Sequence, residues 1–294
     1  MSARLIDGVA HGKRIRAEVA AEVKTLAARG LTPGLAVVLV GDDPASAVYV
    51  RSKGKACEEA GMHSVTHHLP ASTAQDELLH LIGTINADPT IHGLLVQLPL
   101  PKHIDTERAL HAVDPRKDVD GFNPINVGKL VLGDPTAFRP ATPYGVQQLL
   151  IREGIETRGA RVVVLGRSTL VGRPMANLLI QDGPGGNATV TVCHSRSRNL
   201  GEITCAADIL IVAIGKPKLV KADMVREGAV VIDVGTTRVE DASAPRGYRL
   251  SGDVDFEPVK AKASAITPVP GGVGPMTIAM LLANTLQAAR LASP

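Results

Sequence analysis

The stretch VVVLGRSTLVGRPMANLL, residues 162–179, decides the fold of this chain. An apolar run at 162–165 stops at Gly166, and an apolar-periodic segment resumes at Val171. This order predicts a buried strand, a glycine-rich turn and a helix. The turn would present free backbone N–H groups at the positive end of the helix dipole, which favours an anion such as a phosphate. Because the glycines do not follow the G-x-G-x-x-G spacing, a plain strand-to-helix turn is the alternative.

Short apolar runs alternate with amphipathic helical patterns along most of the sequence, which predicts parallel βαβ architecture. We expect strands at 35–40, 64–69, 93–96, 162–165, 188–193, 209–214 and 229–234, and helices at 9–28, 44–60, 77–86, 142–152, 171–179, 202–206 and 276–290. The 294 residues have room for two domains, each with its own core. A shift in composition places the boundary near Pro140. We therefore expect an α/β protein in which each domain has a mostly parallel sheet flanked by helices.

The composition excludes several classes of protein. The net charge of +3 is small and the basic residues are spread along the chain, so an extended nucleic-acid footprint is not expected. Cys57, Cys193 and Cys205 are odd in number and lack C-x-x-C spacing, which indicates no disulfide framework and no metal site. The sequence has no signal-like N-terminus and no run of 18 apolar residues. We expect a cytoplasmic protein that is not inserted in a membrane.

A polar face on the helix at 44–60 is the first candidate for chemistry. Ser46, Tyr49 and Lys53 are spaced so that they share one side of this helix. The helix follows the strand at 35–40, so the tyrosine and the lysine would stand just beyond the end of a strand, where they could contact a ligand. A solvated polar face is the alternative.

Two further polar groups follow the strand at 93–96. Prolines end this strand abruptly, which leaves Gln97 at the carboxyl edge of the sheet, where open α/β folds bind ligands. A purely structural glutamine is equally compatible with the pattern. The loop at 117–124 then carries Asp118 and Asp120. This loop supplies too few oxygen ligands for a metal ion, so hydrogen bonding to a ligand or a simple turn is expected.

The segment HSRSR at 194–198 follows the second strand of the second domain. Dinucleotide folds that prefer NAD usually place an acid there, whereas two arginines and two serines suit a 2′-phosphate. NADP is therefore favoured over NAD. The glycine- and proline-rich segment TPVPGGVGPMT at 267–277 has little side-chain bulk and suits a loop that lies on a ligand. The alternative is a tight crossover between the domains, and the two are compatible.

Taken together, these segments closely resemble the bifunctional methylenetetrahydrofolate dehydrogenase/methenyltetrahydrofolate cyclohydrolase family. The resemblance rests on S-x-x-Y-V-x-x-K at 46–53, VQLPLP at 96–101, KDVDG at 117–121, GRS-x-x-VG-x-P at 166–174 and PVPGGVGPMT at 268–277. It implies NADP-dependent oxidation of 5,10-methylenetetrahydrofolate to the methenyl cation, followed by hydrolysis to 10-formyltetrahydrofolate in the same folate pocket. It also implies a homodimer that works in one-carbon metabolism.

The resemblance implies a domain plan for the two reactions. Residues 1–140 would form the folate-binding catalytic domain, and a C-terminal helix at about 277–294 would pack back onto it. Residues 141–276 would form a Rossmann-type NADP-binding domain. The active-site cleft would lie between the two domains, since hydride transfer needs the one-carbon bridge of the folate against the nicotinamide.

The resemblance also assigns roles in the folate domain. Lys53 would be the general acid/base of the hydrolytic step, Gln97 would hydrogen-bond and tune it, and Tyr49 would pack on the folate. Asp120 would hold the amino edge of the pterin. A desolvated lysine near positive charge has a lowered pKa, which suits a proton acceptor beside a cationic carbon. The substrate-binding residues implied in this way are Tyr49, Asp120, Pro270 and Gly271.

In the second domain the resemblance implies which residues contact the dinucleotide. Arg167 and Ser195 would reach the 2′-phosphate. The cofactor-binding residues implied are Gly166, Arg167, Ser168, Ser195, Gly215, Thr236 and Thr277. Two departures from the family pattern are Asn123, where bacterial members often have histidine, and an extra GPGG at 183–186.

Two other functions remain open at this point. A two-domain NADP dehydrogenase of the shikimate or amino-acid type would share the architecture, but it lacks the Tyr49 and Lys53 pair and the Pro-Gly-Gly loop. A non-catalytic NADP-binding regulator would be favoured by loss of Lys53 or Gln97, and both residues are present.

Overall fold

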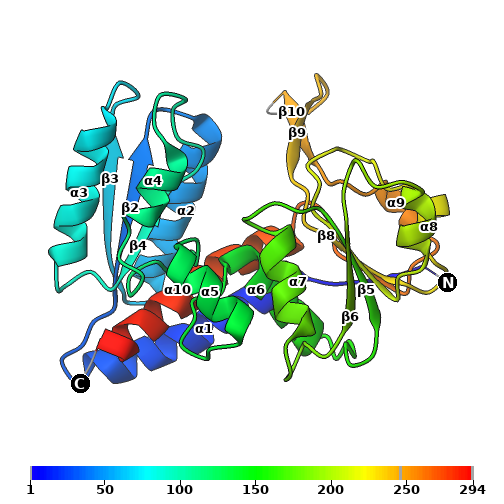
Figure 1. Ribbon diagram of the computed structural model, residues 1–294, viewed down its shortest axis with the longest axis horizontal. Coiled ribbons are helices and arrows are strands. Elements are labelled where there is room, and N and C mark those ends of the chain that lie inside the picture. The colour runs from blue at the N-terminus through cyan, green and yellow to red at the C-terminus, as the bar shows by residue number, and fades with distance from the viewer. Residues whose placement is uncertain (1, 245–246, 293–294) are drawn as a thin grey trace. The chain divides into compact units, whose positions relative to one another are not determined.

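The computed structural model describes residues 2–244 and 247–292, and the chain divides into two compact units. Unit 1 contains residues 1–12 and 142–277, and unit 2 contains residues 13–141 and 278–294. Each unit has a parallel sheet with helices around it (Figure 1). The expected two-domain α/β class is therefore confirmed.

The sheet of unit 2 has three parallel strands in the order β3-β2-β4. The central strand β2 (Gly34–Val40) lies between β3 (His63–Leu69) and β4 (Gly93–Val96). All seven residues of β2 are buried, which explains its continuous apolar sequence, since a central parallel strand is covered on both faces. The strands that the sequence predicts at 35–40, 64–69 and 93–96 are confirmed to within one residue at each end.

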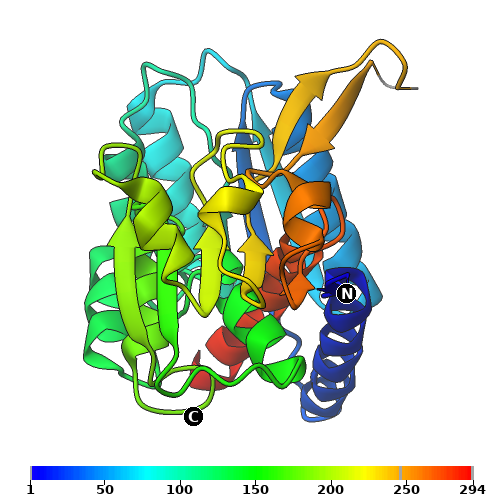
Figure 2. The same cartoon turned by 90° about the vertical axis from the view of Figure 1, so that its right-hand side faces the viewer.

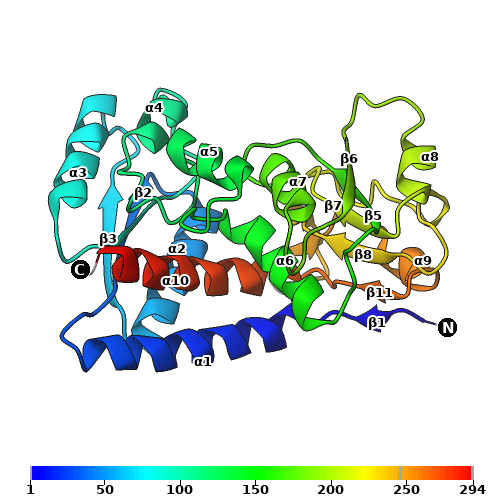
Figure 3. The same cartoon turned by 60° about the horizontal axis from the view of Figure 1, so that its bottom comes forward.

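Helices surround this sheet and bring the polar face of α2 to its carboxyl edge. The helices of unit 2 are α2 (Pro44–Glu59), α3 (Gln75–Ala87), α4 (Thr106–His111) and α5 (Pro124–Leu132), with the greater parts of α1 (Gly8–Ala27) and α10 (Val273–Ala292). Helix α2 begins where the sequence predicts, because the Asp43 side chain accepts a 2.7 Å bond from the N–H of Ser46 and Pro44 occupies the first turn. Within unit 2, α1 and α10 run side by side (Figure 3), and Arg290 forms an ion pair with Glu22.

Unit 1 has a six-stranded parallel sheet in the order β1-β11-β8-β7-β5-β6 (Figure 2). Its strands are β1 (Arg4–Leu5), β5 (Arg161–Leu165), β6 (Thr189–Cys193), β7 (Ile209–Val212), β8 (Val230–Asp233) and β11 (Ala265–Ile266). Its helices are α6 (Ala141–Arg152, of which Ala141 falls in unit 2), α7 (Gly172–Ile180), α8 (Leu200–Cys205), α9 (Phe256–Lys260) and the short 3₁₀ helix η1 (Ala222–Met224). The chain runs from β5 outward to β6 and then crosses to β7 on the other side of β5. The strand order therefore reverses between β5 and β7, where open α/β sheets bind ligands.

Three features differ from the sequence-based expectation or were not anticipated. The family resemblance implies that the N-terminal residues belong to the first domain, whereas in the structure residues 2–12 belong to unit 1, because β1 pairs with β11. An antiparallel hairpin of β9 (Thr237–Glu240) and β10 (Tyr248–Ser251) was not expected. Helix α6 begins at Ala141, one residue before the predicted start at 142, so Thr142 lies inside the helix and does not cap it. Among the described residues, no helix is long and apolar enough to cross a membrane.

Candidate active site

Lys53 lies on the buried side of helix α2 and is only 8% exposed. Its Nζ donates a 3.0 Å hydrogen bond to Oε1 of Gln97. Ser46 on the same helix face is also buried, whereas Tyr49 is 43% exposed. A solvated polar face therefore does not describe this side of α2. This side of α2 carries the buried amine of Lys53 and, one helical turn away, the accessible aromatic ring of Tyr49.

The end of strand β4 fixes the side chain of Gln97. The backbone N–H of Gln97 donates 2.8 Å to the Val38 carbonyl, which continues the ladder to β2. Its side-chain Nε2 donates 2.7 Å to the Leu98 carbonyl. This bond leaves Oε1 as the atom that faces Lys53. The acceptor of the lysine is therefore a neutral oxygen with a defined orientation.

Asp120 is half-buried and acts electrostatically on Lys53. Burial raises the pKa of Asp120 to about 6, and the positive charge of Lys53 opposes this shift. Burial in turn lowers the pKa of Lys53, and the charge of Asp120 offsets part of that effect. Because burial is the largest influence on the pKa of Lys53, a larger fraction of this side chain is a neutral amine than in an exposed lysine. A neutral amine is the form that can accept a proton.

Asp118, the other carboxylate of this loop, accepts hydrogen bonds from groups of the protein itself. It is buried, and its Oδ2 accepts bonds from the Asn123 N–H at 2.8 Å and from Nδ2 of Asn126 at 2.9 Å. The side chain of Asn284 on α10 donates 2.7 Å to the carbonyl of Val119. The loop is thus held from both sides of Asp120. The sequence carries no local signal for Asn284, which lies 165 residues from its partner.

Asn123, which departs from the family pattern, has a local structural use. Its Oδ1 accepts a 3.0 Å bond from the Ile125 N–H and caps helix α5, and its Nδ2 donates 3.0 Å to the Val113 carbonyl. An asparagine meets both needs through one side chain, because the amide offers an acceptor and a donor.

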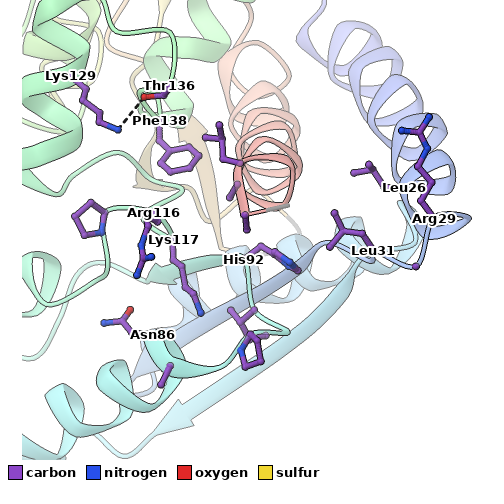
Figure 4. A pocket seen from close by; sticks show the side chains of 18 residues that line it. Leu26, Arg29, Leu31, Asn86, His92, Arg116, Lys117, Lys129, Thr136 and Phe138 are labelled. Atoms are coloured by element: carbon purple, nitrogen blue, oxygen red, sulfur yellow. Dashed lines mark hydrogen bonds between the residues drawn. The ribbon is translucent and has the colours of Figure 1, made fainter. Parts of the chain in front are cut away.

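A hollow of about 920 Å³ in unit 2 lies away from Lys53. It opens where β2 and β4 begin, whereas Gln97 follows the opposite end of β4. Figure 4 shows Lys117, Lys129, His92 and Phe138 around it. The lysines have local partners, since Lys117 Nζ donates to two carbonyls near the end of α3 and Lys129 Nζ donates 3.0 Å to Oγ1 of Thr136. We therefore do not place the folate in this hollow.

The glycine turn of unit 1 requires glycine for steric reasons. Gly166 has a φ of 140°, and a Cβ at this position would collide with the carbonyl oxygen of Ala213. A Cβ on Gly172 would collide with the Gly166 carbonyl. Ser168 Oγ accepts a 3.1 Å bond from the Val171 N–H at the start of α7. Arg167 and Ser168 are exposed on this turn.

The basic segment at 194–198 lies beside this turn. The N–H of Gly166 donates 2.8 Å to the carbonyl of Cys193, the last residue of β6. The following loop is closed by a 3.0 Å bond from the His194 N–H to Oγ of Ser197. Ser195, Arg196 and Arg198 are exposed there. Arg167 and Ser195 therefore follow neighbouring strands at one edge of the sheet.

Of the remaining predicted residues of unit 1, Gly215, Thr236, Pro270 and Gly271 lie on loops, whereas Thr277 lies near the start of helix α10. Gly215 has a φ of 71° and follows β7, and Thr236 follows β8. Thr277 and Thr142 share a 3.0 Å hydrogen bond between their Oγ1 atoms. Gly271, next to Pro270, has a φ of 106°, which requires the conformational freedom of glycine.

A glycine turn at the reversal point of one sheet and a buried lysine at the edge of another define a two-domain, dinucleotide-binding α/β protein. The model of the tetrahydrofolate dehydrogenase/cyclohydrolase catalytic domain matches residues 6–120, and the model of the NAD(P)-binding domain of the same family matches residues 140–293. The chain belongs to the tetrahydrofolate dehydrogenase/cyclohydrolase family.

Individual relatives match over nearly their whole length. The bifunctional protein FolD of Dehalococcoides mccartyi is 58% identical over 294 residues, which cover 99% of this chain and 98% of the relative. The crystal structure of the FolD methylenetetrahydrofolate dehydrogenase/cyclohydrolase from Campylobacter jejuni is 49% identical with a TM-score of 0.92, and covers 99% of each chain. The Trypanosoma brucei FolD structure, complexed with NADP cofactor and inhibitor, is 43% identical with a TM-score of 0.94, and covers 99% of this chain and 98% of the other.

Proposed function

We infer that this chain is a bifunctional enzyme of one-carbon metabolism. It oxidises 5,10-methylenetetrahydrofolate to 5,10-methenyltetrahydrofolate with NADP and hydrolyses the methenyl compound to 10-formyltetrahydrofolate. Family membership over both domains supports the pair of activities. Within the structure, the observation that carries the hydrolytic half is the buried Lys53, whose Nζ bonds to the neutral oxygen of Gln97 at 3.0 Å.

Lys53 is suited to move the proton of the hydrolytic step. Water adds its oxygen to the cationic methenyl carbon, and the neutral amine of Lys53 accepts the proton that the water loses. The bond from this carbon to N5 then breaks, and Lys53 returns the proton to N5. The hydroxyl proton leaves as the formyl carbonyl forms, so one proton is released overall. The positive charge of the methenyl compound would lower the pKa of Lys53 further.

Asp120 and Tyr49 are the groups that we assign to folate binding. A carboxylate can accept two hydrogen bonds from the amino edge of a pterin, and Asp120 is the carboxylate that acts on Lys53. The exposed ring of Tyr49 is available for stacking. Pro270 and Gly271 complete the substrate-binding set that the family pattern implies.

The oxidation needs positioning rather than acid–base chemistry. When bound, NADP supplies the acceptor for the hydride that leaves the methylene carbon. The residues of unit 1 suit this cofactor. The turn at Gly166 offers backbone close to the start of α7, and no acidic side chain occurs at 194–198. We assign the 2′-phosphate to Arg167 and Ser195, with Gly215, Thr236 and Thr277 nearer the nicotinamide half.

We further propose that the enzyme is a homodimer in the cytoplasm. Cys57, Cys193 and Cys205 are all free thiols, which supports a reducing compartment. Light scattering on the purified protein tests the dimer, and a mass equal to one chain would contradict it.

The direct test supplies 5,10-methylenetetrahydrofolate with NADP or with NAD and follows both the formation and the decay of the methenyl compound. We expect formation with NADP and faster decay than in buffer alone. Absence of turnover with both cofactors would refute the assignment.

A further inference from the structure

The loop at 213–215 stands at the reversal point of the sheet in unit 1. It follows β7, and its Ala213 carbonyl is the atom with which a Cβ on Gly166 would collide. The loop and the glycine turn are therefore in direct contact at the carboxyl ends of β5 and β7. Open α/β sheets bind their ligands at this kind of position.

All three backbone N–H groups of this loop are already engaged inside the protein. The Ala213 N–H donates 2.8 Å to the carbonyl of Leu165. The N–H groups of Ile214 and Gly215 both donate 2.8 Å to Oδ2 of Asp253. The backbone here can offer a ligand only carbonyl acceptors. Phosphate oxygens are also acceptors, so the loop favours a part of the dinucleotide that carries donors. Because we assign the adenosine end to Arg167 and Ser195, that part is the nicotinamide end, whose carboxamide has an N–H₂ donor.

Asp253 is held in place by a second carboxylate. Oδ1 of Asp233 accepts bonds from the N–H groups of Asp253 at 3.0 Å and Gly235 at 2.9 Å, and its Oδ2 accepts 2.9 Å from the N–H of Val254. Asp253 itself is fully buried, and a Cβ on Gly235 would collide with its carboxylate. The two carboxylates thus connect the loops that follow β7 and β8 with the loop at 251–255.

The two oxygens of the Asp253 carboxylate differ in their surroundings. Within the described residues its Oδ1 has no hydrogen-bond partner, and an unpaired buried oxygen is unfavourable for folding. The favourable bonds of this carboxylate are those that Oδ2 makes. Their donors are the two amides beside the glycine turn.

We propose that Asp253 is a positioning residue for the dehydrogenase, which fixes the loop at 213–215 so that its carbonyls receive the nicotinamide carboxamide. Asp233 supports it through the backbone of Asp253. The inference rests on the proposed NADP-dependent function, and it adds a residue that no motif assigned to the cofactor site. Asp253 acts through the loop and does not itself touch the cofactor.

The test compares Asp253→Ala, which removes the acceptor, with Asp253→Asn, which keeps one side-chain oxygen. The matched control is Asp255→Ala, which removes a partly exposed carboxylate of the same loop whose partner is Lys221. Calorimetry measures binding of NADP and of 2′,5′-ADP, which is the adenosine end of the cofactor without nicotinamide. Hydrolysis of methenyltetrahydrofolate without NADP is measured in the same preparations.

We expect Asp253→Ala to weaken NADP binding at least about tenfold, which matches loss of bonds to a charged group. Binding of 2′,5′-ADP and the hydrolytic rate should stay within about twofold of wild type, and Asp253→Asn should lie between. Unchanged NADP binding would overturn the proposal. Equal losses of NADP and 2′,5′-ADP binding would also overturn it, because they would indicate a general structural role. Binding is read without turnover, so failure of the proposed reaction in the wild-type assay would be a separate result.

Discussion

Lys53 Nζ donates a 3.0 Å hydrogen bond to Gln97 Oε1, and this bond links helix α2 to the end of strand β4. Gln97 gives the buried amine an acceptor without adding a negative charge. A carboxylate in this place would stabilise the ammonium form and raise the pKa of Lys53. Because the amide of Gln97 is neutral, it does not oppose the effect of burial, which lowers the pKa of Lys53.

Gln97→Glu tests this relationship. The new carboxylate should raise the pKa of Lys53, so less neutral amine is present near pH 7. Hydrolysis of the methenyl compound should slow about tenfold for each unit of pKa, and the rate should recover as the pH rises. The pH profile of hydrolysis measures this. If the pH profile of Gln97→Glu coincides with that of the wild-type enzyme, Gln97 does not influence the pKa of Lys53.

Asp120→Asn should weaken folate binding and leave NADP binding intact. The amide keeps the size of the side chain but loses the charge that strengthens hydrogen bonds to the pterin. We expect the KM for methylenetetrahydrofolate to rise about tenfold or more. Asp42→Asn is the matched control, because Asp42 has a highly exposed carboxylate. Equal KM values for the two variants would remove Asp120 from the folate site.

The KM for methylenetetrahydrofolate should depend on pH in the wild-type enzyme. Burial raises the pKa of Asp120 to about 6, so the carboxyl is ionised above that pH and protonated below it. Protonation removes the charged acceptor, so the KM should rise as the pH falls through about 6. In Asp120→Asn this rise should be absent. The dehydrogenase assay at constant ionic strength measures the KM of both enzymes as a function of pH. If the KM of Asp120→Asn rises at low pH as much as that of the wild-type enzyme, Asp120 is not the group responsible.

Ser195→Asp should change the choice of cofactor. The new carboxylate would follow β6, where it repels a 2′-phosphate and can bind a ribose hydroxyl. We expect kcat/KM with NADP to fall about a hundredfold, while kcat/KM with NAD is unchanged or rises. NAD lacks the 2′-phosphate and is the internal control. Equal losses with the two cofactors would place the phosphate elsewhere.

The sequence alone predicted the parts of the fold that depend on local patterns. Strand β2 is apolar along its whole length because it is buried on both faces, and the apolar run is visible in the sequence. The start of α2 is visible in the sequence as Asp43-Pro44, because the capping roles of these two residues need only adjacent residues. The same kind of reasoning placed Tyr49 and Lys53 on one helix face.

The rest depends on contacts between distant residues. Asn284 holds the loop before Asp120 from 165 residues away, and Asp253 binds Gly215 from 38 residues away. A two-residue strand such as β1 is too short for periodicity to reveal, and its pairing with β11 helps to place residues 2–12 in unit 1. Such residues carry no local pattern, so the three-dimensional structure was needed to find them.

The central claim is that Lys53 moves the proton in hydrolysis, and Lys53→Met tests it most directly. The methionine keeps the length and the apolar stem of the side chain but cannot accept a proton. Lys55→Met is the matched control, because Lys55 is exposed and its ion pair with Glu59, at 3.8 Å, is also exposed. The measurement is the decay of methenyltetrahydrofolate above its rate in buffer. We predict a loss of about a hundredfold or more for Lys53→Met, with NADP binding retained and Lys55→Met close to wild type. Hydrolysis by Lys53→Met at the wild-type rate would contradict the account.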